Sequence, residues 1–177
     1  MNCNDHLNER GAAVRQVLAA YFIRHRSCVV EIGSGNNPIS RYLIHRPQVV
    51  YLLDPKLAAS PDDGTQRGPP PEIIRIVGKY QAYKIVPSRP FALVLLGLSL
   101  KGFGSKTDMD DEFCSLLSNA GTVVIDFAVN HPRATEQYQR IRRLRRSDPV
   151  VDIDLRINDE AIILAGFSER KFVVFES

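Results

Sequence analysis

The chain has 177 residues, 44% of them hydrophobic and 24% charged, a composition typical of one globular domain and not of a disordered or fibrous protein. Its longest apolar run, residues 91–100, is about half as long as the roughly 20 residues that a membrane-spanning helix needs, so we expect no membrane association. A net charge of +3 permits a nucleic-acid partner without requiring one.

The cysteines and the first residues bear on the cellular compartment. Cys3, Cys28 and Cys114 are odd in number and lack the spacing of a metal site. The first residues are polar and mixed in charge, unlike those of a signal peptide. We therefore expect a reduced, cytoplasmic protein.

Residues 7–26 have the apolar spacing of an amphipathic helix. Apolar residues recur there at intervals of three and four, which places them on one face and predicts that this face packs inward. They are Val14, Val17, Leu18, Tyr21 and Phe22.

A strand and a glycine turn come next. Residues 28–32, Cys-Val-Val-Glu-Ile, predict a short buried strand because β-branched residues dominate the run. Gly33, Ser34 and Gly35 follow it directly and predict a sharp turn. Glycine suits a place where the backbone turns tightly or approaches a ligand, because it has no Cβ to clash.

A second strand with an acid at its end completes this unit. Residues 38–45 are expected to form a short helix, and the apolar run at residues 49–53 ends in Asp54. Strand, glycine turn, strand and acid is the layout of a nucleotide-binding βαβ unit. The acid in such a unit accepts hydrogen bonds from ribose hydroxyls.

The rest of the chain alternates predicted strands and helices. Residues 58–72 are rich in Pro, Gly and Asp and predict a flexible surface loop. Helices are expected at residues 109–118, with Phe113, Leu116 and Leu117 facing inward, and from Pro132 to about Arg146. Strands are expected at residues 73–77, 91–96, 122–127, 149–157 and 170–176. This alternation predicts a single α/β domain over residues 1–177, with a mostly parallel sheet and an antiparallel C-terminal strand at its end.

Two motifs resemble those of a known family. Glu31-Ile32-Gly33-Ser34-Gly35, followed by Asp54, looks like the first two motifs of the class I (Rossmann-like) S-adenosylmethionine-dependent methyltransferases. The run LLSNAGTVVIDF at residues 116–127 is similar to a further segment of that family. The resemblance implies a Rossmann-like three-layer α/β/α domain and a methyltransferase that uses S-adenosylmethionine.

The resemblance also implies roles for single residues. Gly33 and Gly35 would let the backbone pass beneath the methionine part of the cofactor. Glu31 would lie near its amino group, and Asp54 would hold the ribose. We also place Ser34, inside the turn, and Gly97, where the fourth strand ends, in the cofactor site.

Departures from the family pattern leave alternatives open. Pro38 stands near the family's third glycine and breaks the G-x-G-x-x-G pattern of dinucleotide-binding proteins, which argues against an NAD-dependent oxidoreductase. No N/D-P-P-Y/F signature follows residues 91–96, which argues against methylation of a nucleic-acid base nitrogen. A non-catalytic cofactor-binding domain, acting as a partner or regulatory subunit, remains the alternative to an enzyme.

Candidates for the chemistry are fewer. Ser99 follows the fourth predicted strand and His131 the fifth, and a histidine near neutral pH can act as a general base. We favour the plainer interpretation of His131 as a loop residue before Pro132. Asp126, inside the fifth predicted strand, faintly resembles a ligand of metal-dependent O-methyltransferases, but their acid after strand four is missing. We expect no metal site.

The acceptor of the methyl group is open. Five arginines in the last predicted helix offer a surface for RNA. No aromatic residues are interleaved with them for base stacking, so a solvated helix face explains them better. They are Arg140, Arg142, Arg143, Arg145 and Arg146. We therefore favour a small-molecule acceptor, with the oligomeric state left open.

Overall fold

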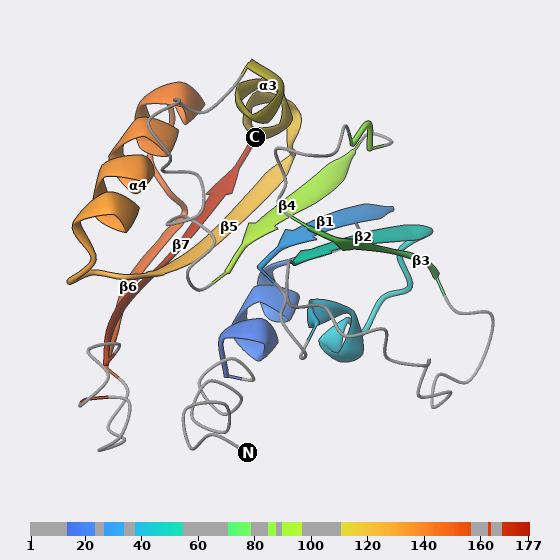
Figure 1. Ribbon diagram of the computed structural model, residues 1–177, viewed down its shortest axis with the longest axis horizontal. Coiled ribbons are helices and arrows are strands. Elements are labelled where there is room, and N and C mark those ends of the chain that lie inside the picture. Colours follow the sequence, from blue (N-terminus) through green and yellow to red (C-terminus); the bar gives the residue numbers. More distant parts are fainter. Residues whose placement is uncertain are drawn as a thin grey trace.

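The computed structural model contains one seven-stranded sheet flanked by helices (Figure 1). It describes residues 14–23, 27–33, 38–54, 71–78, 85–87, 90–96, 111–156, 163 and 168–177, without the side chain of Glu112. The strands are β1 (Cys28–Ile32), β2 (Val49–Asp54), β3 (Glu72–Val77), β4 (Phe91–Leu95), β5 (Thr122–Ala128), β6 (Val151–Arg156) and β7 (Glu169–Glu176). The helices with defined bounds are the 3₁₀ helix η1 (Ile39–Tyr42), α3 (Asp111–Asn119) and α4 (Pro132–Arg145), and residues 14–22 form a further helix, here called the N-terminal helix.

The strand order is β3-β2-β1-β4-β5-β7-β6. The pairs from β3 to β5 are parallel, and β7 pairs antiparallel with both of its neighbours. The predicted α/β class, the mostly parallel sheet and the antiparallel C-terminal strand are confirmed.

The antiparallel C-terminal strand does lie in the terminal part of the sheet, but it is the second strand from that end and not the edge strand. β7 lies inside the sheet, and β6 forms the edge. The reason is burial, because residues 172–175 of β7 are buried on both faces of the sheet, as an inner strand requires. β6 instead exposes Asp152 and Asp154, and both carboxylates pair with Lys171 of β7. Charged side chains are the usual protection of an exposed sheet edge.

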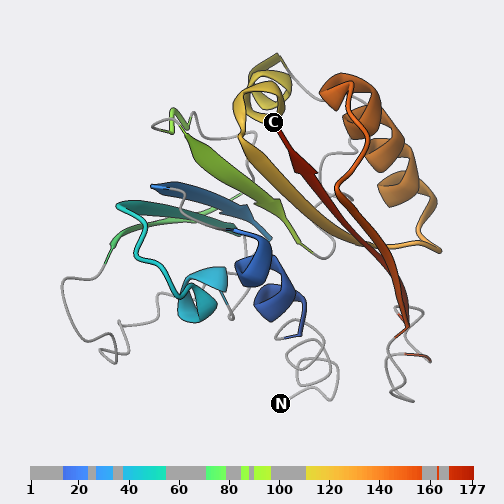
Figure 2. The ribbon, with the colours of Figure 1, turned by 180° about the vertical axis from the view of Figure 1, so that it is seen from behind.

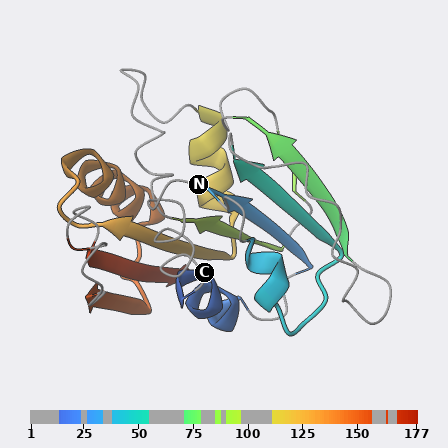
Figure 3. The same ribbon diagram turned by 60° about the horizontal axis from the view of Figure 1, so that its bottom comes forward.

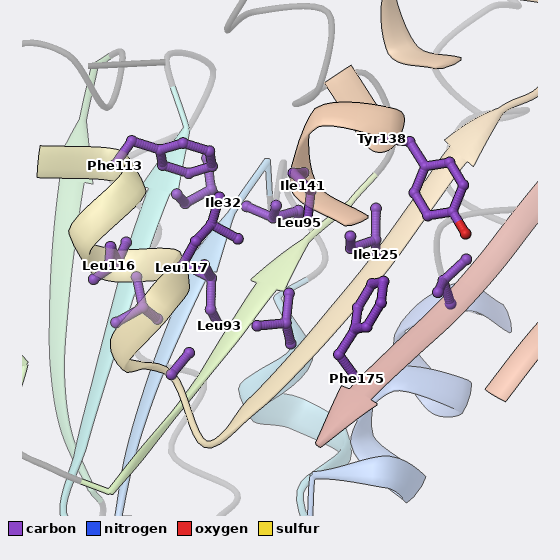
Figure 4. Packing of buried hydrophobic residues seen from close by; sticks show 14 of the residues in the cluster. Ile32, Leu93, Leu95, Phe113, Leu116, Leu117, Ile125, Tyr138, Ile141 and Phe175 are labelled. Atoms are coloured by element: carbon purple, nitrogen blue, oxygen red, sulfur yellow. The ribbon is translucent and has the colours of Figure 1, made fainter. Parts of the chain in front are cut away.

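Helices cover both faces of the sheet, which gives the three layers (Figures 1 and 2). α3 and α4 pack on one face, where Phe113, Leu116, Leu117, Tyr138 and Ile141 join side chains of the strands (Figure 4). The inward face predicted for residues 109–118 is confirmed. The N-terminal helix and η1 lie beside each other on the opposite face, where Ala19, Ile23 and Ile39 are fully buried or nearly so (Figure 3).

The inward face of the N-terminal helix is rotated relative to the predicted one. Of the residues predicted to face inward, Leu18 and Phe22 do pack against the core. Val14, Val17 and Tyr21 are 58%, 51% and 60% exposed, whereas Gln16 and Ala19 are buried. Arg15 and Gln16 contact buried carboxylates of the sheet, those of Asp126 and Glu31 respectively. Leaving such groups unpaired in the interior is more unfavourable than exposing two valines and a tyrosine. The polar contacts therefore set the rotation of this helix.

Two other boundaries differ from expectation. The helix expected at residues 38–45 is only the single turn of η1, which Pro38 precedes in extended conformation. Pro47 follows closely and disfavours helix before it, which leaves room for one turn. Of the loop expected at residues 58–72, Glu72 belongs to β3, and the part up to residue 70 lies outside the described residues.

The helix expected from Pro132 is confirmed as α4, and the residue that caps its C-terminal end, Arg146, has the left-handed conformation, φ 52°. In the described part of the chain, no helix combines the length and the apolar character that crossing a bilayer requires.

Candidate functional site

The candidate site lies at the carboxyl edge of the sheet, where β1, β2 and β4 end side by side. The register places Ile32 level with Leu53 on β2 and with Leu95 on β4. Along the chain, β1 is followed by β2 and β3 on one side of the sheet, and β4 is followed by β5 on the other side. The direction of the strand order therefore reverses between β1 and β4. Open α/β sheets bind their ligands outside the carboxyl ends of the strands at such a reversal.

Gly33 follows β1 and opens the turn. Its backbone has φ 86°, and its amide donates a hydrogen bond to Leu53 O at 2.8 Å. A residue with a Cβ is strained at this φ, and glycine is not. Gly33 therefore presents backbone without a side chain beside the ends of β1 and β2. Ser34, Gly35 and Gly97, also predicted for this site, lie outside the described residues.

Glu31 is the one acid of β1 and is fully buried. Its Oε2 accepts a hydrogen bond from the Ile39 amide at 2.7 Å, and its Oε1 accepts one from Gln16 Nε2 at 3.3 Å. Burial and, to a smaller extent, the charge of Asp54 raise the pKa of Glu31 to about 8, against the opposing effect of the two hydrogen bonds. The carboxyl is thus mostly protonated at pH 7, and a cation placed beside it would favour the ionised form.

Asp54 is the last residue of β2 and is half-buried. Its carbonyl accepts a hydrogen bond from the Gly78 amide at 3.3 Å, which continues the β2–β3 ladder and holds the strand end in place. Its charge acts on Glu31, so two carboxyl groups from neighbouring strands meet at this edge. The position at the end of the second strand agrees with the sequence prediction, and the ribose-binding role stays a prediction.

These features fit S-adenosylmethionine. Gly33 has no Cβ, which leaves room for the cofactor to pass close to its backbone. A buried carboxyl that ionises readily beside a cation suits an amino group, and a partly exposed carboxyl suits a pair of hydroxyls.

No protein-family model and no curated protein sequence matches this chain. The solved structures do offer matches. An S-adenosylmethionine-dependent methyltransferase from Leishmania major has a TM-score of 0.55 at 12% identity, over 97% of this chain and 74% of that one. An rRNA methylase from Streptococcus thermophilus has a TM-score of 0.50 at 14% identity, over 93% of this chain and 94% of that one. The chain has the fold of the class I methyltransferases.

A third similar structure is a protein of the NADB-Rossmann superfamily from Streptococcus agalactiae. Its TM-score is 0.54 at 10% identity, over 92% of this chain and 67% of that one. Likeness at such low identity concerns the fold, and the predicted Rossmann-like domain is thereby confirmed.

His131 lies after β5 and caps α4. Its Nδ1 accepts a hydrogen bond from the Ala134 amide at 3.4 Å. A neutral ring that accepts at Nδ1 carries its proton on Nε2. Nδ1 is thus the atom that would take a proton, and protonation there would break the cap. The role of His131 as a base stays a prediction, as does that of Ser99, which lies outside the described residues.

The arginines of α4 have different surroundings. Arg145 Nη1 donates to the carbonyls of Leu117 and Ala120 at 2.9 and 2.8 Å, which closes the C-terminal end of α3. Arg142 pairs with Asp148 at 3.1 Å on the surface. Arg143 and Arg146 are exposed, and Arg140 is half-buried. The bonds of Arg145 could not be read from the sequence, because the α3 carbonyls lie more than 20 residues away.

Asp126 lies in β5 and is the centre of a buried ion-pair cluster. Arg170 forms two hydrogen bonds to it, at 2.7 and 2.9 Å, and Arg15 Nε lies 2.9 Å from its Oδ2. Burial lowers the pKa of Arg15 to about 10, so the guanidinium stays charged at neutral pH. The Asp126 oxygens are thus occupied by guanidinium groups. In the ranges that the structure describes, no three His, Cys, Asp or Glu side chains gather as a metal site.

Gln16 is the contact of the site that the sequence did not reveal. It is 2% exposed and reaches Glu31 from the N-terminal helix. The available signal was a second spacing, Gln16, Ala19 and Ile23, at intervals of three and four. The apolar spacing of Val14, Val17 and Tyr21 in the same segment predicted a different inward face, so this second spacing was not used.

Proposed function

We propose that this protein is an S-adenosylmethionine-dependent methyltransferase. The observation that carries the proposal is the meeting of three features at one sheet edge: the turn at Gly33, the buried carboxyl of Glu31 and the carboxyl of Asp54. Two further points support it. The same residues match the first motifs of the family in sequence, and the similar Leishmania major structure is an S-adenosylmethionine-dependent methyltransferase.

Each residue has a binding role in this proposal. The Gly33 backbone lies under the methionine part of the cofactor, Glu31 lies near the amino group, and Asp54 binds the ribose hydroxyls. By the sequence resemblance, Ser34, Gly35 and Gly97 belong to the same site. When bound, the cofactor supplies an electrophilic methyl group. The chain's own contribution is to hold the two reactants in position, which accounts for much of the rate of such reactions.

For the acceptor we favour a small molecule. RNA is the second candidate, because six arginines against Glu136 and Asp148 give residues 131–150 a net charge of +4, more than the +3 of the whole chain. The similar structure from Streptococcus thermophilus is an rRNA methylase. Against RNA, Arg145 binds α3, Arg142 pairs with Asp148, and no aromatic side chain accompanies the arginines in α4 beyond the buried Tyr138.

Calorimetry and a transfer assay test the proposal. We expect S-adenosylhomocysteine to bind the purified chain and NAD not to bind. Transfer of a labelled methyl group from S-adenosylmethionine should then appear with a small-molecule pool and not with RNA or protein pools. Binding of NAD alone, or of neither ligand, would overturn the proposal. Binding of S-adenosylhomocysteine without transfer to any pool would instead support the non-catalytic domain.

A further inference from the structure

We propose that Gln16 is a positioning residue of the cofactor site, which makes the N-terminal helix part of that site. The inference rests on the proposed function, because it assigns Gln16 the task of holding Glu31 toward the bound ligand. It concerns a residue that lies outside both motifs of the sequence resemblance.

The geometry shows a carboxyl held from two sides. Each oxygen of Glu31 accepts one hydrogen bond, Oε1 from Gln16 Nε2 at 3.3 Å and Oε2 from the Ile39 amide at 2.7 Å. One donor precedes β1 in the chain, and the other follows the glycine turn. Two separate elements therefore determine the plane of the carboxyl group beside Gly33.

The burial pattern of the helix indicates why Gln16 faces inward. The helix exposes Val14 and Val17 by 58% and 51% while it buries Gln16 to 2%. A helix that served only to cover the sheet would bury the valines and expose the amide, because burying a polar group is unfavourable without a partner. Gln16 donates to the buried Glu31, so this contact, together with the Arg15–Asp126 pair, accounts for a helix orientation that leaves the two valines exposed.

The same contact acts on the charge of Glu31. A hydrogen bond donated to a carboxylate favours its ionised form, and Gln16 opposes the effect of burial in this way. Among the described residues, the charged group that acts on Glu31 is Asp54 of β2, while Arg15, Asp126 and Arg170 form their own cluster. Without Gln16, Glu31 would stay protonated to a higher pH, and of the two donors in the described part of the chain it would keep the Ile39 amide.

Gln16→Met tests the proposal, because methionine keeps the length of the side chain and lacks the donor. The first measurement is the pH at which the Glu31 carboxyl titrates in the ligand-free protein, followed by carbon-13 NMR. The second is the affinity for S-adenosylhomocysteine by calorimetry. We expect a higher titration midpoint and about tenfold weaker binding, as for a lost hydrogen bond to a charged group. Val17→Ala, at an exposed position of the same helix, should change neither quantity.

Gln16→Glu is the second variant and covers the case in which Gln16→Met does not fold. A glutamate can donate to Glu31 only while the two groups share a proton. We therefore expect its affinity for S-adenosylhomocysteine to fall relative to the wild type as the pH rises. The positioning role would be overturned if Gln16→Met had the same Glu31 titration midpoint and the same affinity for S-adenosylhomocysteine as the wild type. It would also be overturned if the affinity of Gln16→Glu changed with pH in the same way as that of the wild type. A wild-type chain that does not bind S-adenosylhomocysteine would overturn the proposed function instead, and the ligand-free titration would still report on Gln16 and Glu31.

Discussion

The carboxylate of Glu31 accepts a hydrogen bond from the backbone amide of Ile39 at 2.7 Å. This bond joins the end of β1, next to Gly33, to the first residue of η1. The acceptor is fully buried, and the nearby charge of Asp54 opposes its ionisation. The turn of the candidate cofactor site is therefore tied to a group whose charge changes near neutral pH.

Glu31 makes the stability of the protein depend on pH. Burial raises its pKa from 4.5 to about 8, so between these values the folded state holds a proton that the unfolded state has released. The free energy of unfolding should then fall as the pH rises through this window, by up to about 1.4 kcal/mol per pH unit. Glu31→Gln cannot ionise and should remove this slope. Urea denaturation at several pH values between 5 and 8 measures the effect, and an equal slope in both proteins would contradict it.

We expect substitution of Asp126 to lower the free energy of unfolding more than substitution of the surface residue Asp148. Asp126→Ala leaves the guanidinium groups of Arg15 and Arg170 buried without their common carboxylate. Breaking a buried ion pair from one side destabilises a protein by about 3–5 kcal/mol. Urea denaturation at pH 7 should show a loss of this size. Asp148→Ala removes an exposed pair with Arg142, for which we expect a loss of less than about 1 kcal/mol. Similar losses of stability in Asp126→Ala and Asp148→Ala would contradict the larger contribution that we assign to the buried cluster.

The inner strands were predictable because most of their residues, on both faces, are apolar. All residues of β4 and β5 are buried, and an apolar run of that length has few other places in an α/β domain. Asp54 was predictable for a related reason. An acid directly after such a run lies at the carboxyl edge of a parallel sheet, wherever the strand stands in the order.

The inward face of the N-terminal helix and the place of β7 were not predictable in this way. Arg15 faces inward because Asp126, more than 100 residues later, lies opposite to it. The spacing of Gln16, Ala19 and Ile23 is compatible with this arrangement, but the local sequence does not favour it over the apolar stripe. The order of β6 and β7 likewise depends on which strand can be buried on both faces, and that comparison requires the whole sheet.

His131 offers a test that separates capping from catalysis. His131→Ala removes the acceptor for the Ala134 amide, and loss of an N-cap costs about 1 kcal/mol of stability. His131→Asn keeps an acceptor at the N-cap and lacks a group that can take a proton near neutral pH. We expect Asn to restore the stability that Ala loses, as thermal unfolding would show. If His131 acts only as a cap, methyl transfer should be normal in His131→Asn, whereas a loss of transfer with normal stability would assign it a role as base.

Asp54→Ala should weaken the binding of S-adenosylhomocysteine by about 1–3 kcal/mol, because the ribose hydroxyls lose a charged acceptor. The fold should tolerate the change, since Asp54 is only half-buried at a strand end and its backbone carbonyl keeps the bond from the Gly78 amide. Calorimetry of ligand binding, with urea denaturation to check the fold, measures both quantities. Glu72→Ala, at the opposite end of the neighbouring strand β3, is the matched control and should bind the ligand normally. Unchanged affinity in a folded Asp54→Ala protein would remove this residue from the site.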